Sequence, residues 1–184
     1  MDGAARGIRT VNGRLIYGKT GGIMDSSHKD LDKQNEPKRS TLTTEAFWEF
    51  SLSVYMTKGM KDAFLALQNK FHGNVNLMLI FIWLDQQNLR VTETGIKELQ
   101  QALHIVEPLL HQYRSLRHKY KPHLPDTLYR ESLDFELQLE KMQQHDLITR
   151  LNQLDLYNNS NQKMSSLYCQ YLDAEILAPN FSIN

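Results

Sequence analysis

The chain has 184 residues, of which 41% are hydrophobic, and its 21 Lys and Arg residues balance its 21 Asp and Glu residues. This length and composition predict one globular domain. A formal net charge of zero argues against a histone-like protein that binds nucleic acid by bulk electrostatics, although it is compatible with a local basic patch. The single cysteine excludes an internal disulfide framework and a multi-cysteine zinc site.

No segment of the sequence is typical of a membrane anchor or a targeting signal. The longest apolar run, residues 77–84, is far shorter than the about 20 residues that a membrane-spanning helix needs. The N-terminus has no apolar stretch followed by a small-residue cleavage site, and its many glycines oppose an amphipathic transit helix. We therefore expect a cytoplasmic protein with no membrane partner.

Residues 1–42 differ in composition from the rest of the chain. They contain six of the nine glycines and few large apolar residues, so we expect a disordered or weakly structured N-terminal extension. Asn12-Gly13 suits the turn of a hairpin over residues 8–17, but an isolated hairpin is only marginally stable. Met24 offers an alternative start, which would make the first 23 residues a misassigned extension.

The remaining sequence has helical periodicity throughout. Thr43 or Thr44 is placed to cap the first predicted helix, and Gly59 to end it. Asn74 is placed to cap a helix that is apolar on almost all sides, as expected of the most buried helix. Thr92 or Thr94 is placed to open the fourth predicted helix. The predicted helices cover about residues 44–58, 60–71, 75–87, 94–120, 127–154 and 164–176.

The fourth of these segments carries an apolar seam with a proline inside it. The seam consists of Ile96, Leu99, Leu103, Val106, Leu110 and Tyr113. Pro108 predicts either a kink or a break with Pro108 in the first turn of a new helix. The sequence thus predicts an all-α fold, a single-domain bundle of five to six helices. We expect the N-terminal extension to cover residues 1–42 and the bundle to cover residues 43–157. A linker and a C-terminal amphipathic helix are expected over residues 158–184.

Several motifs of the helical region resemble a known family. They are Phe-Trp-Glu-Phe-Ser-Leu-Ser-Val-Tyr at 47–55, Ala-Leu-Gln at 66–68, Asn-Val-Asn-Leu at 74–77 running on to Trp83-Leu84, and Tyr-Arg-Ser-Leu-Arg-His-Lys at 113–119. They resemble a family of small, uncharacterised gammaproteobacterial proteins defined as a domain of unknown function. The resemblance covers about residues 43–154 and implies an all-α cytoplasmic bacterial protein. It implies no activity.

Two motifs contain the residue types of a ligand site, but the sequence around them does not favour such a site. Residues 13–20 match the phosphate-binding pattern G-x-x-x-x-G-K-T, but bulky residues fill the loop and no parallel sheet is predicted around it. His104, Glu107 and His111 have the spacing of a partial metal site on one helix face. Their spacing equally suits solvated residues opposite the apolar seam, which we favour, so we expect neither a metal nor a cofactor.

A basic cluster follows in the same segment and consists of Arg114, Arg117, His118, Lys119 and Lys121. An acidic run comes directly after it, so the two runs can pair across adjacent antiparallel helices as a structural charge seam, which is the favoured interpretation. A site for phosphate, RNA or an acidic partner is the alternative.

A polar residue and several aromatic residues are candidates for a pocket. Asn76 and Asp85 flank the apolar run of the third predicted helix, and a buried Asn76 needs hydrogen-bond partners such as Ser51, Ser53 or Gln68. The favoured interpretation is a polar network that fixes helix register. The alternative is a small-ligand pocket lined by Phe47, Trp48, Phe50 and Trp83 together with Asn76.

No catalytic constellation stands out, and Cys169 has no activating neighbour in sequence, so we expect it to be a structural thiol. We therefore expect a non-enzymatic protein-interaction or adaptor module whose partner is another protein. Nucleic-acid or phosphate binding through residues 114–121 is the first alternative. A small-ligand or metal-dependent enzyme is the second.

Overall fold

The computed structural model describes residues 36–159 and 162–183. The hairpin predicted at 8–17, the phosphate-loop match at 13–20 and the alternative start at Met24 lie outside these residues.

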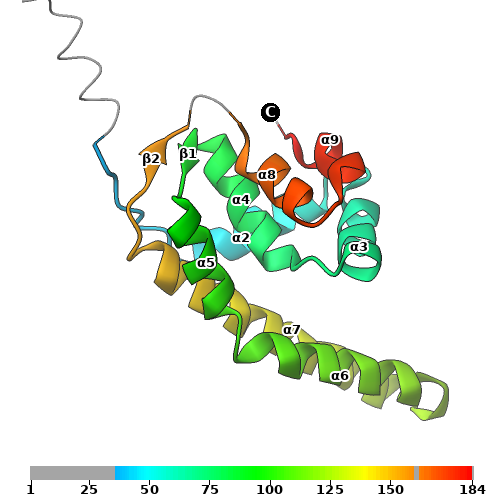
Figure 1. Cartoon of the computed structure of the whole chain (residues 1–184). Coiled ribbons are helices and arrows are strands. Elements are labelled where there is room, and N and C mark those ends of the chain that lie inside the picture. The colour runs from blue at the N-terminus through cyan, green and yellow to red at the C-terminus, as the bar shows by residue number, and fades with distance from the viewer. Residues whose placement is uncertain (1–35, 160–161, 184) are drawn as a thin grey trace, which may run out of the picture. The chain divides into compact units, whose positions relative to one another are not determined.

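The described residues form an all-α structure, which confirms the predicted fold class (Figure 1). Its eight α-helices are α2 (Thr44–Tyr55), α3 (Met60–Phe71), α4 (Val75–Gln86), α5 (Glu93–Ala102), α6 (Val106–Tyr120), α7 (Asp126–Leu151), α8 (Met164–Tyr171) and α9 (Ala178–Phe181). Two 3₁₀ turns (Lys121–His123 and Glu175–Leu177) and two short strands, β1 (Leu89–Arg90) and β2 (Tyr157–Asn158), complete them. None of the helices in the described part of the chain is long and apolar enough to cross a membrane.

Local capping sets the starts of three helices as the sequence predicts. The side chains of Thr43, Asn74 and Thr92 each accept a hydrogen bond from a backbone N–H in the first turn of α2, α4 and α5. Gly59 precedes α3 in the left-handed region, with φ of 81°, a conformation that glycine adopts without a steric penalty.

The fourth predicted segment is broken into two helices. Leu103 to Ile105 form a turn, and α6 starts at Val106, so Pro108 lies in its first turn. A first-turn residue needs no intrahelical N–H partner, which is why proline is tolerated there. This confirms the prediction of a break with Pro108 in the first turn of a new helix. Because of this break and the separate short helix α9, the described residues contain more helices than the predicted six.

Helix α4 is the centre of the core. Its residues 76–82 and Leu84 are all buried, and it packs against α7 and α8. The rings of Phe81 and Tyr168 meet edge to face at a centroid distance of 5.2 Å and join α4 to α8. Helix α8 therefore shares the core of the preceding helices.

Residues near both predicted domain boundaries take part in this structure. Lys38 and Leu156 exchange two backbone hydrogen bonds, and Leu42 packs against the core, although both Lys38 and Leu42 lie in the predicted extension. Strand β2, which includes the first residue of the predicted 158–161 linker, pairs antiparallel with β1. The last predicted helix ends at Tyr171, and Ile176 lies exposed in the following 3₁₀ turn.

Helices α6 and α7 form an antiparallel hairpin whose far end extends beyond the other helices (Figure 1). The buried apolar core between them is small: Val106, Leu110 and Leu139, with Tyr113 packed against it. Polar contacts hold the rest of the hairpin, as described below.

Candidate functional site: a polar pocket between α2, α3, α6 and α7

A chain of polar side chains crosses the interior where α2, α4 and α7 meet. Gln144 Nε2 donates to Ser51 Oγ at 3.3 Å and to Asn76 Oδ1 at 3.0 Å. Asn76 Nδ2 in turn donates to Gln143 Oε1 at 3.0 Å, and Asn74 Nδ2 approaches the same oxygen at 3.4 Å. Gln143 and Gln144 are 1% and 2% exposed, so these bonds form away from bulk water. A polar network around Asn76 exists, but its direct partners are Gln143 and Gln144. Of the three partners suggested by the sequence, Ser51 joins the network only through Gln144, and Ser53 bonds the Phe50 carbonyl instead.

The two ends of this chain fix the direction of every amide in it. Asn74 Oδ1 accepts from the Leu77 backbone N–H as the helix cap, so only its Nδ2 is free to donate inward. The Ser51 hydroxyl donates to the Phe47 carbonyl at 2.7 Å, so its oxygen accepts from Gln144. With these directions, the Gln143 Nε2 donor and the Gln144 Oε1 acceptor are left buried without a protein partner.

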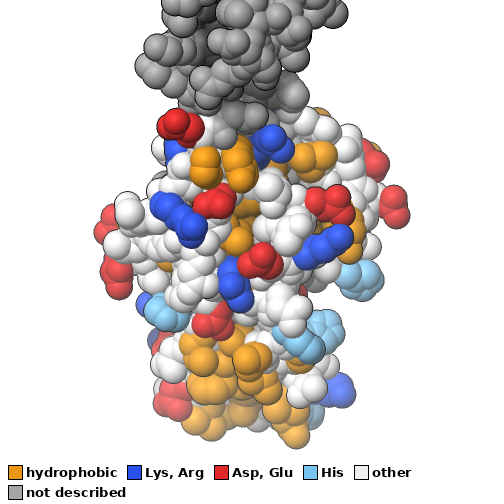
Figure 2. All heavy atoms as spheres, turned by 60° about the vertical axis from the view of Figure 1, so that its left-hand side comes forward, with side chains coloured by type: hydrophobic (Ala, Val, Ile, Leu, Met, Phe, Trp, Pro, Cys, Tyr) orange, Lys and Arg blue, Asp and Glu red, His pale blue; other side chains and the backbone are white. Residues whose placement is uncertain are grey.

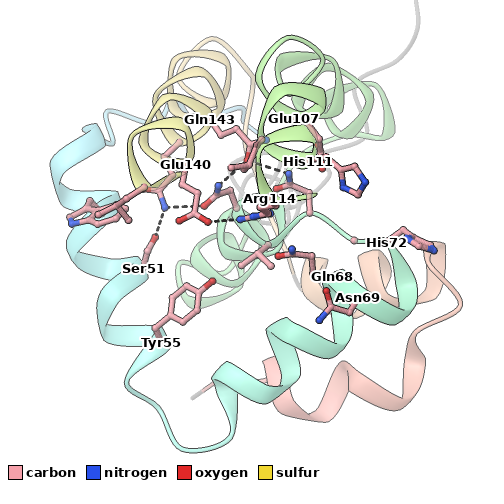
Figure 3. A pocket seen from close by; sticks show the side chains of 18 of the residues that line it. Ser51, Tyr55, Gln68, Asn69, His72, Glu107, His111, Arg114, Glu140 and Gln143 are labelled. Carbon is pink, nitrogen blue, oxygen red and sulfur yellow. Dashed lines mark hydrogen bonds and ion pairs between the residues drawn. The ribbon is translucent and has the colours of Figure 1, made fainter. Parts of the chain in front are cut away.

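Both orphaned atoms belong to residues that line a cavity of about 620 Å³. Its walls come from α2, α3, the start of α4, α6 and α7, and Figure 3 shows the side chains that surround it. They include Trp48, Ser51, Leu52, Tyr55, Gln68, Asn69, His72, Asn74, Asn76, Glu107, Leu110, His111, Arg114, Leu137, Glu140, Gln143 and Gln144. The volume lies within the range typical of small-molecule sites.

One wall of the cavity carries paired charges. Arg114 pairs with Glu140 (Figure 3). The Arg114 Nε also donates to Glu136 at 2.8 Å. Burial raises the pKa of the Glu140 carboxyl, against the opposing effect of Arg114. Burial, with a contribution from Glu140, raises the pKa of Tyr55 to about 12, so Tyr55 presents a neutral hydroxyl at neutral pH.

The structure divides the predicted aromatic pocket residues between pocket and core. Trp48 and Asn76 line the cavity, and Lys141 Nζ lies 4.7 Å from the Trp48 ring centroid. Phe47 is fully buried in the core, and Phe50 and Trp83 pack against that core without lining the cavity.

The predicted metal ligands are not brought together. His104 lies in the turn before α6, whereas Glu107 and His111 lie on α6 and line the cavity. Among the described residues, no group of three His, Cys, Asp or Glu side chains is arranged to hold a metal ion.

The predicted basic cluster divides into paired and exposed residues. Arg114 and Arg117 both bind Glu136, and Arg117 also donates to the Tyr129 hydroxyl at 2.9 Å. These contacts form the charge seam between α6 and α7. The rest of the cluster, His118, Lys119 and Lys121, is exposed, with Lys121 Nζ 5.3 Å from the Tyr129 ring centroid.

Asp85 and Cys169 both have structural positions outside the cavity. Asp85 accepts hydrogen bonds from the backbone N–H groups of Met164 and Ser165 and from the Ser165 hydroxyl, so it caps α8 from the end of α4. Cys169 is fully buried, and burial raises the pKa of its thiol to about 11. The expected structural thiol is consistent with this environment.

Gln143 and Gln144 are the residues that the sequence analysis missed. They follow Leu139 and precede Leu147 and Ile148 at helical spacing, so they interrupt the buried apolar face of α7. Two amides within an apolar stripe are the sequence signal that would have pointed to them.

The fold and the pocket define a helical protein with a polar cavity at the meeting point of its central helices. Residues 46–147 match the family described as "Protein of unknown function (DUF2390)". This is more than half of the chain, so the protein belongs to that family. No curated protein and no solved structure matches the chain.

Proposed function

We propose that this protein binds a small uncharged polar molecule in the cavity, without converting it. The observation that supports this is the pair of orphaned atoms, the Gln143 Nε2 donor and the Gln144 Oε1 acceptor. A ligand that presents an acceptor and a donor, such as a carboxamide or a lactam, would satisfy both atoms when the two side chains rotate toward the cavity, a rotation that is needed because neither atom has accessible surface.

Energetic cost supports a ligand over an accidental gap. Each buried polar atom without a partner costs about 1–3 kcal/mol, and the two residues that carry the orphaned atoms, Gln143 and Gln144, both line the same cavity. A single water occupies roughly 30 Å³ of liquid, whereas the cavity has a volume of about 620 Å³. The space is therefore large enough for an organic molecule of moderate size.

The charges of the cavity disfavour an anionic ligand. The Arg114 guanidinium is engaged by Glu136 and Glu140, so it offers no free positive charge to an anion. The network at the base of the cavity consists of amides and a hydroxyl, which bind without exchanging protons at neutral pH. Trp48 and Tyr55 supply aromatic surface for the apolar part of the ligand.

The test is a thermal-shift screen of the full chain against small carboxamides and lactams, followed by calorimetry on each compound that stabilises it. Gln143→Met and Gln144→Met remove the orphaned atoms while keeping a side chain of similar length. We expect each substitution to raise the Kd by about tenfold or more. The reason is that the loss of one buried hydrogen bond costs about 1.4 kcal/mol, which corresponds to a tenfold change in Kd.

Gln86→Met is the matched control, because Gln86 is an exposed glutamine at the end of α4 outside the cavity. Circular dichroism and urea unfolding of each variant establish that it is folded. A screen in which no amide binds, or a ligand whose affinity is the same in all three variants, would contradict the proposal.

A second candidate is the protein-interaction module predicted from the sequence. The observation that favours it is a set of half-exposed apolar side chains on the α6–α7 hairpin, at a distance from the cavity. The alternative of nucleic-acid binding through residues 114–121 has less support, because Arg114 and Arg117 are engaged by carboxylates.

A further inference from the structure

The α6–α7 hairpin has charged residues inside and apolar residues outside. Glu136 is 9% exposed and lies between Arg114 and Arg117, where the two helices face each other. Six large apolar side chains of the hairpin are instead between 47% and 54% exposed: Leu109, Leu116, Tyr120, Leu128, Phe135 and Met142. We call these six the apolar face.

Helical spacing places the six residues on one side of the hairpin. On α6, Leu116 follows Leu109 by seven residues and Tyr120 follows Leu116 by four, so the three lie on one side of the helix. On α7, the members of the set are spaced seven residues apart: Leu128, Phe135 and Met142. The Tyr113 ring contacts the Phe135 ring at a centroid distance of 4.9 Å and joins the two rows. At the lower end of Figure 2, where the hairpin lies, orange side chains gather into one patch.

The patch lies on the side of the hairpin away from the cavity. The cavity-lining residues of α6, Glu107, His111 and Arg114, recur at four and three residues and so occupy a different side of the helix from Leu109 and Leu116. Ligand binding and contacts through the apolar face are therefore separable.

Charge differs between the two edges of the apolar face. Glu131 and Asp134 are exposed along the α7 edge, and Lys119 is exposed along the α6 edge. Arg117 contacts both Tyr129 and Glu136, which places Lys119 at about the level of Glu131 on the neighbouring helix. In Figure 2 red side chains lie on one edge of the patch and a blue one on the other.

We propose that the apolar face is the docking surface for a second copy of this chain. We place a two-fold axis parallel to the helices of the hairpin and between the two apolar faces. Helix α6 of one copy then lies over α7 of the other, so Lys119 of each copy faces Glu131 of its partner. The two hairpins then form a four-helix bundle that buries both apolar faces. The isologous arrangement is closed, so it yields a dimer and no larger assembly.

The area and composition of the face fit this partner. Large apolar and aromatic side chains that are half exposed present roughly 80–100 Å² each, which gives about 1,000 Å² over the two copies, at the lower end of specific interfaces. Tyr120, Phe135 and Met142 are of the residue types enriched at interface cores. We therefore expect a reversible dimer.

Sedimentation equilibrium of the full chain across the micromolar range tests the proposal. The expected mass is twice the 21.5 kDa of one chain. Leu116→Glu and Phe135→Glu each place a charge within the apolar face, and we expect each to weaken dimerisation by at least about tenfold. Ile176→Glu is the matched control, since Ile176 is 80% exposed in a 3₁₀ turn outside the hairpin, and it leaves the dimer intact.

Charge reversal tests the orientation of the two copies. Lys119→Glu weakens the dimer, and Lys119→Glu combined with Glu131→Lys restores it. Circular dichroism establishes that each variant is folded. A monomer at every concentration, or a dimer unaffected by Leu116→Glu and Phe135→Glu, overturns the proposal. The inference rests on the second candidate function, and because Leu116 and Phe135 do not line the cavity, its failure leaves the ligand-binding test unchanged.

Discussion

Polar residues at single positions carry most of the specific chemistry of this protein. Asp85 is partly buried, and Gln143 and Gln144 are buried, but they differ in whether the protein satisfies their polar atoms. Asp85 is bonded by the first turn of α8, whereas each glutamine keeps one unpartnered polar atom. The difference separates residues that stabilise the fold from residues that we propose bind a ligand.

Cys169 is expected to react slowly with thiol reagents. Burial raises its pKa to about 11, so at pH 8 its thiolate fraction is about a hundredfold lower than for a thiol with the ordinary value. The rate of 5,5′-dithiobis(2-nitrobenzoate) modification checks this in the native protein and in urea. Since Cys169 is the single cysteine, the signal is unambiguous. Equal rates in both states would contradict the buried, protonated thiol.

At the scale of helices, local sequence explains where each helix starts, and side chains from other helices explain how they are joined. Thr43, Asn74 and Thr92 cap their own helices, as the sequence predicts. Helix α8 has no such local cap, since Lys163 precedes it, and the Asp85 carboxylate of α4 serves instead. A cap from 79 residues away is not visible in the local pattern.

Asp85→Ala is predicted to destabilise the protein by about 2 kcal/mol, because it leaves the first N–H groups of α8 without an acceptor. Urea unfolding measures the change. Asp85→Asn keeps one acceptor oxygen and should cost about half as much. If Asp85→Ala is as stable as the unchanged protein, the hydrogen bonds to Met164 and Ser165 contribute little to stability.

At the scale of the whole molecule, the hairpin and the remaining helices are stabilised differently. The main core is apolar and centred on α4, whereas the outer part of the hairpin depends on Glu136 and its two arginines. Removing one partner of a buried ion pair costs more than the pair contributes, because the remaining charge stays buried. The hairpin is therefore expected to open separately from the core.

Glu136→Gln tests this, since it leaves Arg114 and Arg117 with one carboxylate fewer. We expect amide hydrogen exchange in residues 111–138 to become faster by about tenfold or more, with exchange in α4 unchanged. Glu49→Gln, at an exposed carboxylate on α2, is the control and should change neither region. Equal acceleration in α4 and the hairpin would show that the two parts unfold together.

The sequence by itself determined the helical class, helix starts at or beside Thr43, Asn74 and Thr92, an interruption near Pro108 that is either a kink or a break, and the central position of α4, because all of these follow from local propensity and periodicity. It also indicated that the basic and acidic runs of α6 and α7 could pair. Tertiary structure alone decided that Gln143 and Gln144 border a cavity, that Phe47 belongs to the core and that Asp85 caps α8. The physical reason is that burial and hydrogen-bond partners depend on which helices meet, and that is set by packing between residues far apart in the chain.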